Sequence, residues 1–214
     1  MVRIGLGVAV VGVAVLAVGY SQYKSSKGAS TEPVRVTLEE LEAGTAPPSA
    51  HLKLGPHVRL YPLCVYSYEF QPGGPGPKTK VNYIFYPVVS QNHPYLKLLA
   101  QGAENAQLKS FAVLVKTDSF RSVGAIPNYD AESPSLQGLV VNTLLSDDDR
   151  RAIRDVWKLD ESKLVILAEG RKPAYKWLMG GGIAAIALGV LLILVKLFKG
   201  HGDAFPTLET PSMD

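Results

Sequence analysis

The sequence predicts an α+β fold in which a small, mostly antiparallel β domain, with an OB-like barrel as one candidate, is flanked by two transmembrane helices. Three observations lead to this class. Apolar residues concentrate at the two ends of the 214-residue chain. Short β-type runs separated by turn residues fill the middle, and two helix-capping patterns lie among them. Only 19% of the residues are charged, against roughly 25% in an ordinary globular domain.

The two terminal segments carry the apolar excess. Residues 178–195 form an eighteen-residue run without a charged side chain, and residues 4–19 form a sixteen-residue run of Gly, Ala, Val, Ile and Leu. We therefore expect transmembrane helices over 2–23 and 175–199, with aromatic and lysine side chains at their ends. The first segment also fits a cleaved signal peptide, but its apolar run is longer than a typical signal core.

Small residues give each terminal segment a face for close helix packing. They are Gly5, Ala9, Gly12 and Gly19 in the first segment and Gly181, Ala185 and Gly189 in the second. These faces predict an interface between the two helices of one chain, or a homo-oligomer of several chains. The alternative is that Gly and Ala are merely common in membrane helices.

Two spans would place the middle of the chain on one side of a membrane, and the predicted location is integral to a bacterial inner membrane. Basic residues on the domain side favour the cytoplasm, although long loops follow this rule poorly. Among them, Arg171, Lys172 and Lys176 are candidates for contacts with lipid headgroups. The alternative is that they only mark the end of the last strand. The predicted partners are the lipid bilayer and an unidentified protein.

The first half of the middle region begins with a flexible tether over 24–33, and the domain follows over 34–174. Thr37 and Glu40 form a capping-box pattern that opens a short helix, which Gly44 ends. Alternating apolar residues over 58–70 predict a half-buried strand in which Pro62 marks a bulge or an edge. A Gly- and Pro-rich turn then leads to a second strand over 81–89, completing a hairpin.

Short apolar runs predict the strands of the second half. They lie over 111–115, 139–144 and 164–168, and a short helix is expected over 95–101. Ser146, followed by three aspartates, opens a helix that runs to about Lys158. The tail over 200–214 has no periodicity and is predicted to be disordered.

The search for chemistry yields no catalytic, cofactor-binding or metal-binding residue. The net charge of +3 offers no concentrated basic face for nucleic acid, and a single cysteine excludes an internal disulfide. Cys64 could in principle pair with His51, His57 or His93, but it lies on the apolar face of a predicted strand. The three aspartates fit a helix cap better than a metal site.

Three short motifs carry a resemblance. The chain resembles a family of uncharacterised bacterial two-span membrane proteins in residues 37–41 (Thr-Leu-Glu-Glu-Leu), 138–142 (Gly-Leu-Val-Val-Asn) and 169–173 (Glu-Gly-Arg-Lys-Pro), followed by the glycines of 180–182. Its layout is also similar to that of mitochondrial two-span ubiquitin ligases without their RING. The first resemblance implies no activity, since that family is uncharacterised. The second implies no ligase activity, because a RING needs cysteine ligands that the tail lacks.

The sequence favours a non-enzymatic function, in which the central domain is a membrane-held scaffold or a partner-recruiting module. This hypothesis predicts an exposed aromatic patch around Tyr61, Tyr83 and Tyr86. The alternative is a membrane-bound enzyme of unrecognised class with a site built from loops, which predicts a deep pocket with converging His, Asp or Glu side chains.

Overall fold

In the computed structural model the chain forms two compact units. It describes residues 2–25, 28–69, 72–103, 106–159, 163–173 and 175–201. The helical unit combines 1–24 with 174–214, and the sheet unit comprises Ser25–Pro173. The predicted disordered tail lies outside the described residues from 202 onward.

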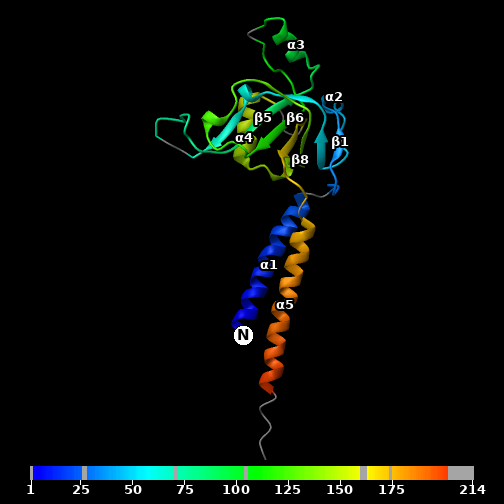
Figure 1. The fold of residues 1–214 in the computed structure, drawn as a ribbon, viewed down its shortest axis with the longest axis vertical. Coiled ribbons are helices and arrows are strands. Elements are labelled where there is room, and N and C mark those ends of the chain that lie inside the picture. The colour runs from blue at the N-terminus through cyan, green and yellow to red at the C-terminus, as the bar shows by residue number, and fades with distance from the viewer. Residues whose placement is uncertain are drawn as a thin grey trace, which may run out of the picture. The chain divides into compact units, whose positions relative to one another are not determined.

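The helical unit is an antiparallel pair formed by α1 (Val2–Ser25) and α5 (Tyr175–His201) (Figure 1). Glycines bring the two backbones close together. A Cβ atom on Gly12 would lie 2.9 Å from the backbone nitrogen of Ile186, and one on Gly182 would lie 3.0 Å from that of Leu16. A side chain larger than hydrogen at either position would force the helices apart.

Neither terminal helix fulfils the predicted role of a membrane span. Across the residues that the structure describes, no helix combines the length and the apolarity that crossing a bilayer requires. The predicted transmembrane helices and the predicted integral membrane location are therefore wrong. The sixteen-residue apolar run of the first segment is shorter than the roughly 17 to 25 residues that span a hydrocarbon core, and the eighteen-residue run of the second lies at the low end of that range.

A curled mixed sheet dominates the sheet unit. Its strands are β1 (Val34–Val36), β2 (His51–Leu54), β3 (His57–Arg59), β4 (Val65–Tyr68), β5 (Val81–Val89), β6 (Val113–Thr117), β7 (Ala131–Ser133), β8 (Leu136–Val140) and β9 (Val165–Glu169). The spatial order is β1-β2-β8-β9-β6-β5-β3-β7, and β4 pairs with β5 alongside this path. The β1–β2 and β6–β9 pairs are parallel, and the other pairs are antiparallel.

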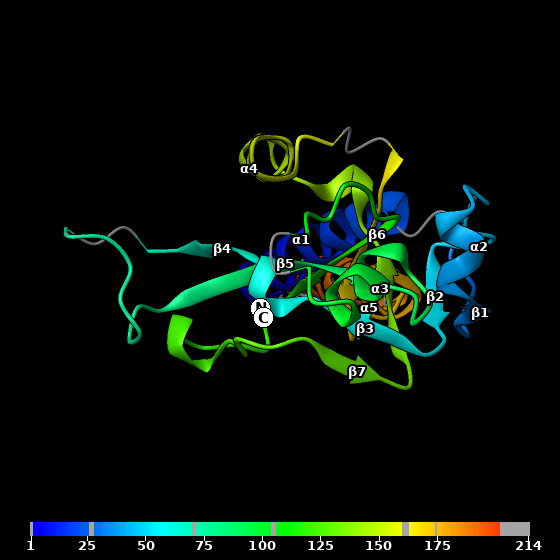
Figure 2. The same ribbon diagram turned by 90° about the horizontal axis from the view of Figure 1, so that it is seen from above.

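Over the described residues the sheet is open and does not close into a barrel, so the predicted OB-like barrel is wrong. The α+β assignment is confirmed. Strands β1 and β7 form the two ends of the path. The chain crosses between distant parts of this path through two tight connections, Gly55-Pro56 between β2 and β3 and Pro134-Ser135 between β7 and β8. Because each connection is only two residues long, the sheet must curl strongly. Figure 2 shows this curvature, with the β4–β5 hairpin projecting at one end.

Three helices accompany the sheet: α2 (Leu38–Glu42), α3 (Pro94–Ala100) and α4 (Asp147–Trp157). The two capping predictions are confirmed. Thr37 and Glu40 form a reciprocal capping box at α2, and Ser146 forms one with Asp149 at α4. Both α2 and α4 bury apolar side chains in the cores of the unit.

The sheet has a core on each of its faces. Tyr86 and Leu167 belong to the inner core, together with Leu38 of α2, whereas Phe85 and Ile166 belong to the outer core, together with Ile153 of α4. Neighbouring residues of β5 and β9 thus enter different cores, as the alternation of a strand requires. Both faces of the central strands are therefore buried.

The strand predicted over 58–70 is interrupted. Strand β3 ends at Arg59, the 3₁₀ turn η1 (Tyr61–Leu63) follows, and β4 begins at Val65. Pro62 explains the interruption, because proline has no N–H for the ladder and its fixed φ suits a turn. The predicted strand over 81–89 is confirmed and coincides with β5.

Gly138 of β8 lies close to the backbone of β9. A Cβ atom at this position would overlap the carbonyl oxygen of Ala168 in β9. In the register of the pair, Gly138 lies opposite Glu169. Glycine at this position therefore fixes the distance at which β9 presents the Glu169 side chain.

Candidate functional site

Polar side chains gather at two places on the sheet unit. The first is the clamp, which we define as Arg59, Tyr61, Tyr86, Ser133 and Glu169. The second is the basic cleft, a surface cavity of about 460 Å³ beside β1 and β2. Charged side chains of the clamp pair with each other, whereas the two cations of the basic cleft have no ion-pair partner among the described residues. This difference decides which of the two places is available to a partner.

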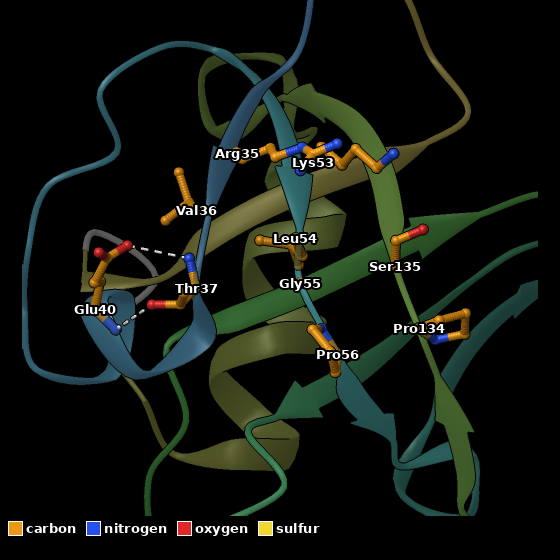
Figure 3. A pocket seen from close by; sticks show the side chains of 10 residues that line it. All are labelled: Arg35, Val36, Thr37, Glu40, Lys53, Leu54, Gly55, Pro56, Pro134 and Ser135. Atoms are coloured by element: carbon orange, nitrogen blue, oxygen red, sulfur yellow. Dashed lines mark hydrogen bonds between the residues drawn. The ribbon is translucent and has the colours of Figure 1, made fainter.

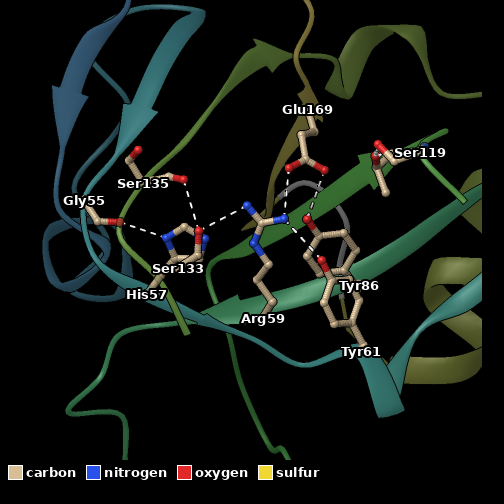
Figure 4. Close-up of polar contacts among 10 residues, drawn as sticks. Gly55, His57, Arg59, Tyr61, Tyr86, Ser119, Ser133, Ser135 and Glu169 are labelled. Carbon is tan, nitrogen blue, oxygen red and sulfur yellow. Dashed lines mark hydrogen bonds and ion pairs between the residues drawn. The ribbon is translucent and has the colours of Figure 1, made fainter. Parts of the chain in front are cut away.

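Arg59 lies at the centre of the clamp and donates hydrogen bonds to three side chains (Figure 4). Its Nη1 group lies 3.0 Å from Glu169 Oε1 and 3.2 Å from the Tyr61 hydroxyl, and its Nη2 group lies 3.2 Å from Ser133 Oγ. The Arg59 and Glu169 side chains are only 19% and 23% exposed, so water screens their attraction weakly. The clamp thus joins strands β3, β7 and β9.

Tyr86 adds strand β5 to the clamp. Its hydroxyl donates to Glu169 Oε2 at 3.3 Å, and its ring packs against Tyr61 with the centroids 4.7 Å apart and the ring planes tilted by 44°. Burial, followed by the negative charge of Glu169, raises the pKa of Tyr86 well above its ordinary value. The phenol therefore stays protonated and acts as a donor, not as a base.

His57 lies next to the clamp and holds one of the tight connections. It is fully buried, and its Nδ1 atom lies 2.8 Å from the carbonyl oxygen of Gly55. Burial lowers the pKa of His57, because it outweighs the hydrogen bond to Gly55, which acts in the opposite direction. The imidazole is therefore neutral at pH 7, and Nδ1–H donates to Gly55.

The histidines do not form a catalytic pair with Cys64. His51 contacts the Ser30 carbonyl and the Gln137 side chain, and His93 accepts a hydrogen bond from a backbone N–H in α3. Burial raises the pKa of the Cys64 thiol, which disfavours the thiolate that nucleophilic chemistry needs. The geometry thus agrees with a structural cysteine.

Asp149 connects helix α4 to the outer face of the sheet. Its carboxylate accepts from the Tyr83 hydroxyl at 2.6 Å and from Lys116 Nζ at 3.1 Å. Burial opposes ionisation of Asp149, but these two donors outweigh it and hold its pKa below the ordinary value. Over the described part of the chain, no three His, Cys, Asp or Glu side chains are grouped as metal ligands would be.

The predicted aromatic patch is wrong. Tyr61 and Tyr86 are 6% and 0% exposed because they pack in the inner core. Only Tyr83 is partly exposed, on the outer face. The alternation over 58–70 placed Arg59 on the side of its strand opposite Val58 and Leu60, and the structure agrees. That side does not face solvent, because Arg59 enters the clamp.

The basic cleft lies at the edge of the sheet. The residues that line it are Arg35, Val36, Thr37, Glu40, Lys53, Leu54, Gly55, Pro56, Pro134 and Ser135. Figure 3 shows Arg35 and Lys53 extending side by side, with the Ser135 hydroxyl on the same side of the cleft. Both tight connections contribute to its wall.

Arg35 and Lys53 are register partners in the parallel β1–β2 pair. Within the described residues, neither side chain has an ion pair or a hydrogen bond with another residue. Glu40 also lines the cleft, but its carboxylate accepts from the Thr37 backbone at 3.1 Å as part of the capping box. Two adjacent cations therefore face this cavity without a counter-charge of their own.

The predicted helix-packing residues differ in their surroundings. Gly12, Gly19 and Gly189 are buried and Ala185 is half-buried, whereas Gly181 has no atom near the position of a Cβ. Gly182, one residue further on, makes the close contact instead. The surroundings of Gly5 and Ala9 lie outside the described part of α1.

The predicted headgroup-binding residues follow the last strand. Arg171 and Lys172 are exposed after β9, and Arg171 lines a second cavity of about 570 Å³ together with Glu169. The side chain of Lys176 is outside the described residues. Contact with lipid headgroups stays a prediction for all three.

Sequence reasoning missed both groups of residues that the fold brings together. For the clamp, Glu169 belongs to a motif that the resemblance rests on, and Tyr61 and Tyr86 were named together, but for an exposed patch and not for a buried network. Arg35 and Lys53 lie in strands of three and four residues, which are too short to show an alternation. No protein-family model matches the chain, and no curated protein or solved structure matches it either.

Proposed function

We propose that the sheet unit is a non-catalytic module that recruits a protein partner at the basic cleft. The observation that carries this proposal is the pair of cations, Arg35 and Lys53, which line a preformed cavity and have no ion-pair partner in the part of the chain that the structure describes. Unpaired like charges side by side cost free energy in the free protein. A partner that supplies the opposite charge would relieve this cost.

The chemistry of the clamp supports recruitment over catalysis. Every charge in it is matched from within, because Arg59 pairs with Glu169 and Tyr86 donates to the same carboxylate. A general acid or base needs a titratable group that can reach a substrate. The protonated phenol of Tyr86 donates to Glu169, and Nδ1 of the neutral His57 imidazole donates to Gly55. The other ring nitrogen of His57, Nε2, has no hydrogen-bond partner among the described residues, but it is fully buried.

The second candidate is an enzyme with a loop-built site, favoured by one observation. Glu169 lines the 570 Å³ cavity with Asp118 and Ser119, so one clamp carboxylate borders a polar space. Turnover of any ester, phosphoester or peptide in a substrate panel would favour this candidate if Glu169→Gln abolished it. The exposed Glu69→Gln variant is the matched control.

Selection of peptides from an unbiased displayed library against the full chain tests recruitment. Ser135→Trp would fill the basic cleft, and Ser119→Trp in the other polar cavity is the matched control. We expect selected peptides to bind the native chain and Ser119→Trp but not Ser135→Trp. Selected peptides that bind all three proteins equally, or a selection that yields none, would contradict recruitment at this cleft.

A further inference from the structure

The charges of the basic cleft define the chemistry of its occupant. Resting on the proposed function, we propose that the recruited segment is an acidic peptide whose carboxylates pair with Arg35 and Lys53. In the parallel register these residues lie directly opposite each other on neighbouring strands. Strands in a sheet lie about 4.8 Å apart, so two carboxylates of one segment can reach both cations.

The cations differ in the geometry they offer. Arg35 is exposed on the edge strand β1, whereas Lys53 is half-buried on β2. A guanidinium binds a carboxylate through two parallel hydrogen bonds, whereas an ammonium acts as a compact point charge. The pair therefore suits one bidentate carboxylate at the rim and a second one deeper in the cavity.

The wall of the basic cleft is held in place from behind. His57 donates to the carbonyl of Gly55 at 2.8 Å, and the Ser133 hydroxyl donates to the carbonyl of Ser135 at 3.1 Å. Ser133 is in turn fixed by Arg59 of the clamp. Because hydrogen bonds hold both connections in place before binding, little conformational entropy of the wall is lost when a peptide binds.

A peptide fits this site better than a nucleic acid or an anionic membrane surface. Extended polyanions are bound by broad basic surfaces, whereas this cavity offers two cations and also the Glu40 carboxylate. Glu40 would repel a dense array of phosphates at close range. A segment with two separated carboxylates can avoid Glu40 and still reach both cations.

Fluorescence anisotropy with the full chain tests the inference. The probes are three labelled octapeptides in which serine alternates with glutamate, glutamine or lysine. We expect the glutamate peptide to bind most tightly, and each of Arg35→Gln and Lys53→Gln to weaken it by about three- to fivefold. Added salt should weaken the same complex, because charge pairs at a partly open site are screened.

Charge reversal gives a sharper test than charge removal. The double variant Arg35→Glu with Lys53→Glu should lose the glutamate peptide and prefer the lysine peptide. The matched control is Arg121→Glu with Lys78→Glu, an exposed arginine and lysine outside the cleft that give the same change in net charge. It should retain the native preference.

The possible failures are distinguishable. Library peptides that depend on the cleft but bind without regard to glutamate would overturn this inference and leave recruitment intact. If no peptide depends on the cleft, recruitment itself fails. Binding of phosphatidylserine vesicles or duplex DNA through Arg35 and Lys53, without binding of the glutamate peptide, would also overturn the inference.

Discussion

The clamp and the basic cleft are linked through Ser133, which accepts from Arg59 and donates to the carbonyl oxygen of Ser135, yet they use arginine in opposite ways. Arg59 has three partners within the chain, whereas Arg35 has none among the described residues. The first guanidinium holds strands together, and the second is available to another molecule. The comparison teaches that pairing and burial, and not residue type, separate a charge that maintains the fold from one that can recruit.

The largest expected effect comes from breaking the clamp. Glu169→Ala leaves Arg59 and the Tyr86 hydroxyl without their shared acceptor, and we expect a loss of about 3 kcal/mol in the free energy of unfolding. Urea denaturation followed by circular dichroism measures it. Glu69→Ala, which removes an exposed ion pair with Lys80, is the control and should cost less than about 0.5 kcal/mol. Equal losses in both variants would show that the clamp does not stabilise the fold.

The next effect comes from the strand spacing on which the clamp depends. In Gly138→Ala the new methyl group would meet the Ala168 carbonyl, and we expect about 2 kcal/mol of destabilisation. Gly76→Ala, where no atom lies near the added Cβ, is the matched control. Thermal unfolding of the two variants gives the comparison, and a Gly138→Ala protein as stable as the control would refute the close approach of β8 and β9.

Asp149 provides a pH-dependent contribution of intermediate size. Its pKa in the folded protein lies below the ordinary value of 3.8, so its stabilising effect is present above about pH 4 and is lost as the pH falls further. We expect Asp149→Asn to lower the free energy of unfolding by about 1.5 kcal/mol at pH 7. The difference from the native chain should become smaller in acid, because Asp149 is then protonated in the native chain. Asp148→Asn, at an 88% exposed side chain, is the control. Unfolding curves measured between roughly pH 2 and pH 7 cover the range in which this linkage acts. The assignment would be contradicted if the difference in free energy of unfolding between the native chain and Asp149→Asn stayed constant over this range.

The smallest effect on stability is expected at the basic cleft. Removing both cations with Arg35→Gln and Lys53→Gln breaks no internal ion pair, so the free energy of unfolding should change by less than about 0.5 kcal/mol. A small gain would reflect relief of the like-charge contact. A large loss in urea denaturation would mean that these side chains maintain the fold and are not free for a partner.

Local signals predicted the elements whose causes are local. The capping boxes at Thr37 and Ser146 and the strand β5 depend on residues close together in the sequence, and all three are confirmed. Strands β1, β2 and β7 were missed because they have only three or four residues. Such short strands depend on their neighbours in the sheet and not on their own pattern.

The candidate site could not be predicted because its parts meet only in the folded chain. Arg59 and Glu169 are 110 residues apart in sequence, and no spacing rule links them. Apolar periodicity placed Arg59 opposite Val58 and Leu60 correctly, but it could not show that this side of the strand is covered by the clamp. The terminal segments show the same limit, because counting apolar residues overestimated their ability to cross a membrane.

The central claim is that unpaired cations in the basic cleft serve a partner whereas paired ones maintain the fold. Thermal unfolding with the glutamate octapeptide at about 100 times its dissociation constant tests it most directly, because a ligand of the folded state adds about 2.7 kcal/mol at that ratio. The account predicts this gain for the native chain and for Glu69→Ala. For Arg35→Gln with Lys53→Gln at the same peptide concentration it predicts only about 1 to 1.5 kcal/mol, because two independent three- to fivefold losses of affinity multiply. An equal gain in the cleft variant, or no gain in the native chain, would contradict it.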